Sequence, residues 1–237
     1  MIDIVDHNPE TGEVVSYNFK QIIAIQYHLL FPVILKTYIP IVLLLLSIVI
    51  VSKILGTYMG KYFKDLSNFS HLSHLTGLIS NIGIIFWCAS ATLCFFCSAF
   101  VKSQFHESLM PLFLLYSGFL TSILLFDDFF MFHDYIFPVF FHINERQTYL
   151  SYLIITLAYL IIFRKLILNT EFLLVFLALG FFGLLLGFDF FSDITHSNIM
   201  DGLFEDGTKF FGIVTWLTYF ARLCFQYLKS FELTCSQ

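Results

Sequence analysis

The stretch LMPLFLLYSGFLTSILLFDDFFMFHD, residues 109–134, decides the fold. It is a long apolar run that ends in two adjacent carboxylates, Asp127 and Asp128, with His133 and Asp134 following at once. A helix needs about 20 mostly apolar residues to cross a bilayer. Ionisable groups placed where hydrocarbon gives way to headgroups are costly, so they indicate a function by default. We therefore predict a membrane-spanning helix whose polar end belongs to a functional site.

The composition of the whole chain supports a membrane protein. Of its 237 residues, 58% are hydrophobic and only 12% are charged, and the mean hydropathy is +0.84. A soluble domain carries about 25% charged residues. The net charge of −5 gives no reason to expect a nucleic-acid partner. We expect a multi-pass protein of the plasma membrane, or of the inner membrane in a bacterium, whose first partner is the lipid bilayer.

Six apolar segments are long enough to span, so the predicted fold class is an all-α integral membrane protein. They are residues 38–55, 78–101, 109–132, 148–163, 172–191 and 207–228, within one transmembrane domain over residues 1–237. Residues 1–18 form a polar N-terminal segment without the basic and apolar regions of a signal peptide. Residues 19–36 predict an interfacial amphipathic helix that ends around Pro32 or Pro40. The aromatic segment 134–147, between spans three and four, is expected to be semi-buried at the membrane surface.

Six spans place most of the acidic residues at one membrane face. The connectors after spans one, three and five must lie on the same side, and they carry most of the acidic residues. The opposite face holds fewer acids, namely Glu107, Glu171 and those of the N-terminal segment. Counting Lys and Arg near the helix ends gives seven against five in favour of an inside N-terminus. That orientation predicts that the acidic face lies outside.

The spacing of the ionisable residues predicts stripes along helices. Residues three, four and seven apart share a helix face, and Asp189, Asp193 and His196 have that spacing at the end of span five. Asp127 and Asp134 are seven apart at the end of span three. Span six offers a further stripe, which contains Glu205, Lys209, Gly212, Trp216 and Tyr219.

Carboxylates and imidazoles that converge from several helices are a ligand set for a divalent metal, and such a mixed set suits Zn, Mn or Fe better than Ca or Mg. The candidate metal ligands are Asp127, Asp128, His133, Asp134, Asp189, Asp193 and His196. The catalytic candidates are Glu205, as a base or further ligand, and Lys209, as the counter-charge of Glu205. A bound metal would activate water at the interface, where lipid bonds lie. The first hypothesis is therefore a metal-dependent hydrolase acting on a lipid or another interfacial substrate.

Two other functions use the same residues. Closely spaced carboxylates also serve as proton relays or cation sites in transporters and channels. Transport comes second because spans two and four offer only a thin polar path, with Ser90, Thr92, Ser98, Ser151 and Thr156. The third hypothesis is a non-catalytic membrane subunit that docks a partner. As a structural alternative, the acids near span six are helix caps or surface charges.

Other motifs add little chemistry. Cys94 and Cys97 form a C-x-x-C in the middle of an apolar span, where small packing residues are the favoured interpretation. Gly180, Gly183 and Gly187 allow close helix packing, either within the chain or in a homo-oligomer. The H-E-x-x-H and G-x-S-x-G signatures of hydrolases are absent.

Overall fold

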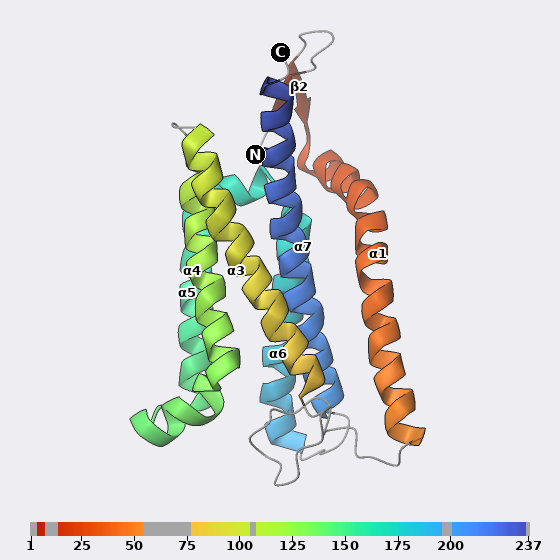
Figure 1. Cartoon of the computed structure of the whole chain (residues 1–237), viewed down its shortest axis with the longest axis vertical. Helices are drawn as coiled ribbons and strands as arrows, with labels where there is room; N and C mark the ends of the chain where they lie inside the picture. Colours follow the sequence, from red (N-terminus) through yellow and green to blue (C-terminus); the bar gives the residue numbers. More distant parts are fainter. Residues whose placement is uncertain (1–3, 8–13, 55–76, 105–107, 196–200, 236–237) are drawn as a thin grey trace.

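The computed structural model describes residues 4–7, 14–54, 77–104, 108–195 and 201–235, and within these ranges the chain is a helical bundle preceded by a small hairpin (Figure 1). Strands β1 (Ile4–His7) and β2 (Val14–Tyr17) pair antiparallel. The helices are α1 (Phe19–Ile54), α3 (Leu78–Gln104), α4 (Met110–Phe130), the π-helix η2 (Phe132–Phe141), α5 (Glu145–Leu168), α6 (Phe172–Thr195) and α7 (Asp201–Cys235).

The helices pack around α3 and α7. Helix α3 lies between α4 and α7, α6 packs along α7, and α5 contacts α4, η2 and α6. The core between them is rich in aromatic side chains, with Phe113, Tyr219 and Phe220 fully buried. Helix α1 runs along the outside of the bundle against α6 and α7 (Figure 1).

Four helices, α1, α3, α4 and α5, are long and apolar enough to cross a membrane by length and composition. Helix α6 contributes a shorter apolar stretch, Phe172–Gly187. Their outer surfaces are hydrophobic, with side chains such as Leu43, Ile161 and Ile162 more than 60% exposed. The fold is therefore compatible with a multi-pass membrane protein.

The predicted break in α1 was wrong. Residues 19–54 form one continuous helix that contains both Pro32 and Pro40. Each proline removes one backbone hydrogen bond, a loss that helices in apolar surroundings tolerate where neighbouring groups compensate. The buried residues of α1 (Ile22, Leu30, Ile41 and Ile48) recur at intervals close to whole helical turns, so only a narrow stripe faces the bundle.

The predicted stripe of Asp127 and Asp134 was also wrong, because α4 ends at Phe130. Met131 has a left-handed backbone with φ 53°, and its N–H donates to the carbonyl of Asp127. The chain then continues as η2, so Asp134 no longer shares a helical face with Asp127. The structure describes the backbone of Asp134 but not its side chain. The predicted semi-buried segment 134–147 consists of η2, a second left-handed residue at His142 (φ 56°), and the start of α5.

The remaining helices start or end several residues away from the predicted spans. Helix α5 begins at Glu145, three residues before the predicted start, because Asn144 and Gln147 form a capping box. Helix α7 extends beyond the predicted span 207–228 in both directions. Its sequence as a whole is more polar than that of the other helices. Hydropathy marks the apolar centre of a helix, whereas caps and tertiary contacts set its ends.

Candidate functional site

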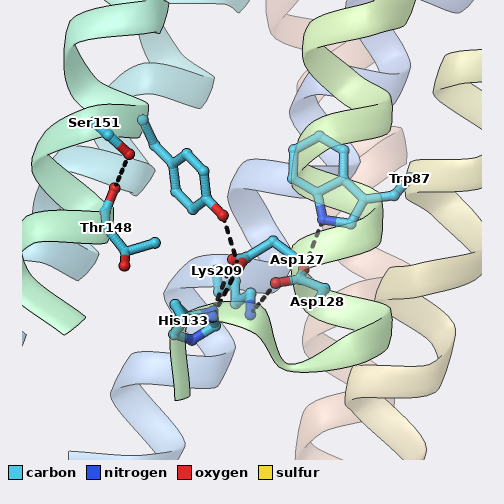
Figure 2. A network of polar contacts seen from close by, with 8 residues as sticks. Trp87, Asp127, Asp128, His133, Thr148, Ser151 and Lys209 are labelled. Atoms are coloured by element: carbon cyan, nitrogen blue, oxygen red, sulfur yellow. Dashed lines mark hydrogen bonds and ion pairs between the residues drawn. The ribbon is translucent and has the colours of Figure 1, made fainter. Parts of the chain in front are cut away.

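Asp127 and His133 form a buried pair at the end of α4 (Figure 2). The Oδ2 atom of Asp127 lies 2.7 Å from Nδ1 of His133, and Oδ1 accepts the backbone N–H of His133 at 3.1 Å. The hydroxyl of Tyr152 on α5 donates to the same Oδ1 at 2.8 Å. Asp127 is 4% exposed and His133 is 7% exposed. The left-handed turn at Met131 creates this pair, because it folds the chain back and brings the imidazole onto the carboxylate.

The second carboxylate, Asp128, is held by two different helices. Its Oδ1 lies 2.7 Å from Nζ of Lys209 on α7, and its Oδ2 accepts the indole N–H of Trp87 on α3 at 2.8 Å. Figure 2 shows Asp128 pointing between these two partners. Adjacent carboxylates on one helix therefore bind different partners, one on α5 and η2 and the other on α3 and α7. Each has an opposite or dipolar partner, which offsets the cost of burying it.

The two pairs form the polar end of a cavity of about 290 Å³ within the bundle. The rest of its wall is mostly apolar, and eight of its nineteen lining residues are leucines contributed by α4, α5 and α6. Trp216 also lines the cavity, seven residues beyond Lys209 on α7, and its indole N–H donates to Thr121 Oγ1 at 3.0 Å. A charged end joined to a hydrocarbon wall is suited to an amphiphilic molecule.

The cavity opens sideways between α5 and α6. Two of its lining residues on α5, Leu153 and Leu157, are 42% and 47% exposed at the outside of the bundle. On the facing side of α6 the cavity is lined by Gly183, which is also exposed. A Cβ added at Gly183, Gly180 or Gly187 would meet no described atom within 4 Å, so this glycine face makes no close contact with the described part of the chain. A molecule in the surrounding apolar phase could reach the cavity through this gap.

The structure brings together four of the predicted site residues, Asp127, Asp128, His133 and Lys209. The structure pairs Lys209 with Asp128, and the predicted pairing of Lys209 with Glu205 stays a prediction because the Glu205 side chain lies outside the described part of the structure. Asp189, Asp193 and Glu205 lie in α6 and α7, but their side chains are outside the described part of the structure, as is that of Asp134. His196 lies outside the described residues. Among the side chains that are described, no group of three or more His, Cys, Asp or Glu is placed to hold a metal.

The helices that carry these residues do meet at one end of the bundle. The C-terminal ends of α4 and α6 and the N-terminal ends of α3 and α7 all lie at the lower end in Figure 1. The site residues of α4, η2 and α7 come from this end. That arrangement agrees with the predicted placement of the connectors.

Sequence analysis missed Trp87 and Tyr152, which hold the two carboxylates. A signal for the second residue was present, since Tyr149, Tyr152 and Thr156 have the spacing of one helical face and all three line the cavity. The sequence did not indicate a role for Trp87, because a tryptophan in an apolar helix is usually a packing or interfacial residue.

A separate row of polar contacts continues beyond Trp216. Ser117 and Tyr159 are hydrogen-bonded at 2.7 Å, and Thr170 and Tyr219 at 2.8 Å. At the far end of the bundle Arg222 binds the carboxylate of Glu171 through two hydrogen bonds of 2.6 and 2.5 Å. Spans three, four and six supply most of these groups. The interior of the bundle is therefore more polar than expected from the few polar residues of spans two and four.

Comparison with known proteins gives one relationship. Residues 22–223 match the family model described as "Domain of unknown function (DUF8692)". No curated protein and no solved structure matches the chain.

Proposed function

The chain belongs to the DUF8692 family, and we propose that it is a membrane hydrolase that draws a lipid into the cavity beside Asp127 and His133. The observation that carries the proposal is the position of this buried pair at the polar end of a leucine-lined cavity with a lateral opening. A hydrolase of membrane lipids needs an imidazole and a carboxylate at one point and a sideways path from the bilayer. Both features come from described residues.

The proposal includes six membrane spans, formed by α1, α3, α4, α5, α6 and α7. The four long apolar helices support four of them by length and composition. Helices α6 and α7 pack against each other and against the other spans, so they share the same apolar surroundings. With six spans the polar end of the cavity lies near one membrane face, where the ester or amide bonds of lipids are found.

In the proposed reaction His133 is the general base. Donation from its Nδ1–H to Asp127 makes Nε2 the nitrogen that accepts a proton, and the carboxylate stabilises the imidazolium that forms. His133 takes a proton from water as the water oxygen bonds to the carbonyl carbon of the lipid. The same proton then passes to the leaving alkoxide or amine as its bond to that carbon breaks. Lys209, which lines the same end, stabilises the developing negative charge.

The test compares two histidine variants of the full-length protein in lipid nanodiscs. His133→Asn removes the base, whereas His142→Asn changes an exposed histidine at the end of η2 whose left-handed backbone suits asparagine. Hydrolysis of a monoacylglycerol should fall by about 10²–10⁴-fold in the first variant and stay unchanged in the second. Equal activity in all three proteins would refute the role of His133, and no activity in the wild type would refute hydrolysis of this substrate.

The same geometry also supports a metal-dependent form of the reaction. A histidine that donates to a carboxylate is the usual arrangement of a metal-bound imidazole, so His133 is the first candidate ligand for Zn, Mn or Fe. Asp134, Asp189, Asp193 and His196 are the further candidates from the sequence. Elemental mass spectrometry of the wild type beside an Asp127→Ala, Asp189→Ala double variant decides this form. Near-stoichiometric metal that disappears in the double variant supports it, and metal-free active protein excludes it.

Cation or proton transport is the second candidate function. It is favoured by a row of separate polar contacts inside the bundle. The hydroxyl of Thr121 donates to the backbone carbonyl of Ser117, the hydroxyl of Ser117 is hydrogen-bonded to that of Tyr159, and the hydroxyls of Thr170 and Tyr219 form a further pair. Such a row reaches from the cavity toward Glu171 at the opposite end of the bundle. Liposomes that contain the protein and a pH-sensitive dye test this function. Proton flux that is lost in Tyr159→Phe, with hydrolysis absent, would favour transport over the hydrolase.

A further inference from the structure

We propose that the cavity takes a single-chain amphiphile with an uncharged head, and that the hydrocarbon chain enters between α5 and α6 across Gly183. This inference rests on the proposed lipid-binding role of the same cavity and names the class of lipid. The inference depends on the size of the cavity, on the charges at its polar end and on the glycine at its opening.

The cavity has room for one hydrocarbon chain. Its volume of about 290 Å³ lies just below the range of about 300–1,000 Å³ for small-molecule sites. The indole of the lining residue Trp216 is held in place by its hydrogen bond to Thr121. The leucines along the wall offer contacts only to hydrocarbon. A lipid with two chains would leave at least one of them outside.

The charges at the polar end favour a head without negative charge. The described ionic side chains that line the cavity are Asp127, Asp128, Lys209 and His133. Two carboxylates stand beside one ammonium and one imidazole there, and the imidazole of His133 is already within 2.7 Å of Asp127. Lys209 is already paired with Asp128 at 2.7 Å. A phosphate or carboxylate head would be repelled, whereas hydroxyl and ester groups could hydrogen-bond at this end.

The opening depends on a glycine. Gly183 lines the cavity and is exposed, and a Cβ there would meet no described atom within 4 Å. A side chain at this position would therefore extend into the gap without displacing the described helices. Gly180 provides a matched control, because it is also exposed and equally open but does not line the cavity.

The experiment measures binding rather than hydrolysis. Radiolabelled 1-O-hexadecylglycerol has one chain, an uncharged head and an ether bond that ester hydrolysis does not cleave. Its affinity for the full-length protein in nanodiscs is compared among the wild type, Gly183→Leu and Gly180→Leu. We expect Gly183→Leu to weaken binding by about tenfold or more, the effect of about two methylenes that are no longer buried. Gly180→Leu should bind as the wild type does. Thermal unfolding of each variant checks its fold, and Gly183→Ala provides a smaller change that should weaken binding less.

Competition tests the two other parts of the proposal. Unlabelled hexadecylglycerol should displace the probe, whereas dihexadecylglycerol and hexadecyl phosphate should compete at least about tenfold less well. Equal affinity of Gly183→Leu and the wild type would overturn the path across Gly183. Equal competition by the two-chain ether would overturn the single-chain class, and equal or stronger competition by the phosphate would overturn the uncharged head.

Failure of the hydrolase proposal would be visible separately. If the probe binds as expected but no ester is cleaved by the wild type, the cavity is a lipid-binding site and the hydrolase proposal is wrong. If esters are cleaved but the probe does not bind in the wild type, this inference is wrong and the reaction uses another class of substrate.

Discussion

Asp127 holds His133 at two points, since its carboxylate is hydrogen-bonded to the ring Nδ1 at 2.7 Å and to the backbone N–H at 3.1 Å. A carboxylate that binds both the ring and the main chain of one residue fixes the position as well as the tautomer of the imidazole. Asp127 and His133 are only six residues apart in the chain, and their contact depends on the end of helix α4 that lies between them.

Asp127→Asn should show whether Asp127 acts on the imidazole of His133 or on the binding of the lipid. The amide keeps the shape of the side chain but does not stabilise an imidazolium, so kcat for ester hydrolysis should fall by about 10²–10⁴-fold. KM and the affinity for hexadecylglycerol should stay nearly unchanged. Tyr152→Phe is the matched control, because it removes one hydrogen bond to the same carboxylate and should cost about tenfold or less. Loss of binding in Asp127→Asn would instead indicate a structural role.

Lys209→Met should destabilise the protein by leaving Asp128 without its counter-charge. Breaking a fully buried ion pair costs about 3–5 kcal/mol. The cost here should be smaller, since 30% of the Lys209 side chain is exposed. The double variant Lys209→Met, Asp128→Asn should recover part of the loss, because the amide oxygen introduced at position 128 can still accept the indole N–H of Trp87. Thermal unfolding in detergent compares the two single variants with the double variant, and additive effects would contradict the coupling.

Met131 provides a test of the turn that forms the site. A left-handed conformation costs a non-glycine residue roughly 1–2 kcal/mol, so Met131→Gly should preserve the pair and stabilise the fold by up to about 1 kcal/mol. Met131→Val should do the opposite, because a β-branched residue is strained at this φ. The comparison uses unfolding temperatures together with hydrolysis rates. Equal stability of the two variants would mean that the left-handed turn is not retained.

Gly212→Ala should disturb the wall of the cavity through Phe182. A Cβ at Gly212 would lie 2.6 Å from the ring of Phe182, which lines the cavity and stacks on Trp87. Overpacking of this kind typically costs about 1–3 kcal/mol, and the displaced ring should also weaken binding of the lipid probe. Gly180→Ala, which meets no described atom, should leave affinity unchanged and raise stability by roughly 0.5–1 kcal/mol, because alanine favours the helix over glycine.

The sequence was sufficient to predict the helical bundle from hydropathy, and it singled out Asp127 and Asp128 as charges at the end of an apolar helix. It did not predict how the two carboxylates divide between partners. That division depends on a helix ending at Phe130 rather than two residues later, and on a left-handed methionine that no residue preference favours. Trp87 and Tyr152 come from distant segments, so only the packing of α3 and α5 against α4 reveals them.

The same limitation explains the prediction for α1. Prolines at positions 32 and 40 indicate helix ends in water, where the freed carbonyl groups can be hydrated. The chain instead continues through both prolines, and its buried stripe runs the length of the helix. Helix ends predicted from propensities measured in water are therefore less reliable for a helix as apolar as α1.

The attachment of α1 to the bundle has a consequence for the proposed membrane location of this protein. Hydrocarbon tails solvate leucine and isoleucine about as well as another helix does. In a bilayer, apolar contacts alone would therefore contribute little free energy to the association of α1 with the bundle. Two polar contacts distinguish the bundle from lipid. The amide of Gln26 binds the carbonyl of Thr170 and the N–H of Leu173, and the hydroxyl of Tyr38 meets that of Thr215 at 2.6 Å. These two points lie twelve residues apart, about 18 Å along the helix, and together they fix its depth and its rotation about its own axis.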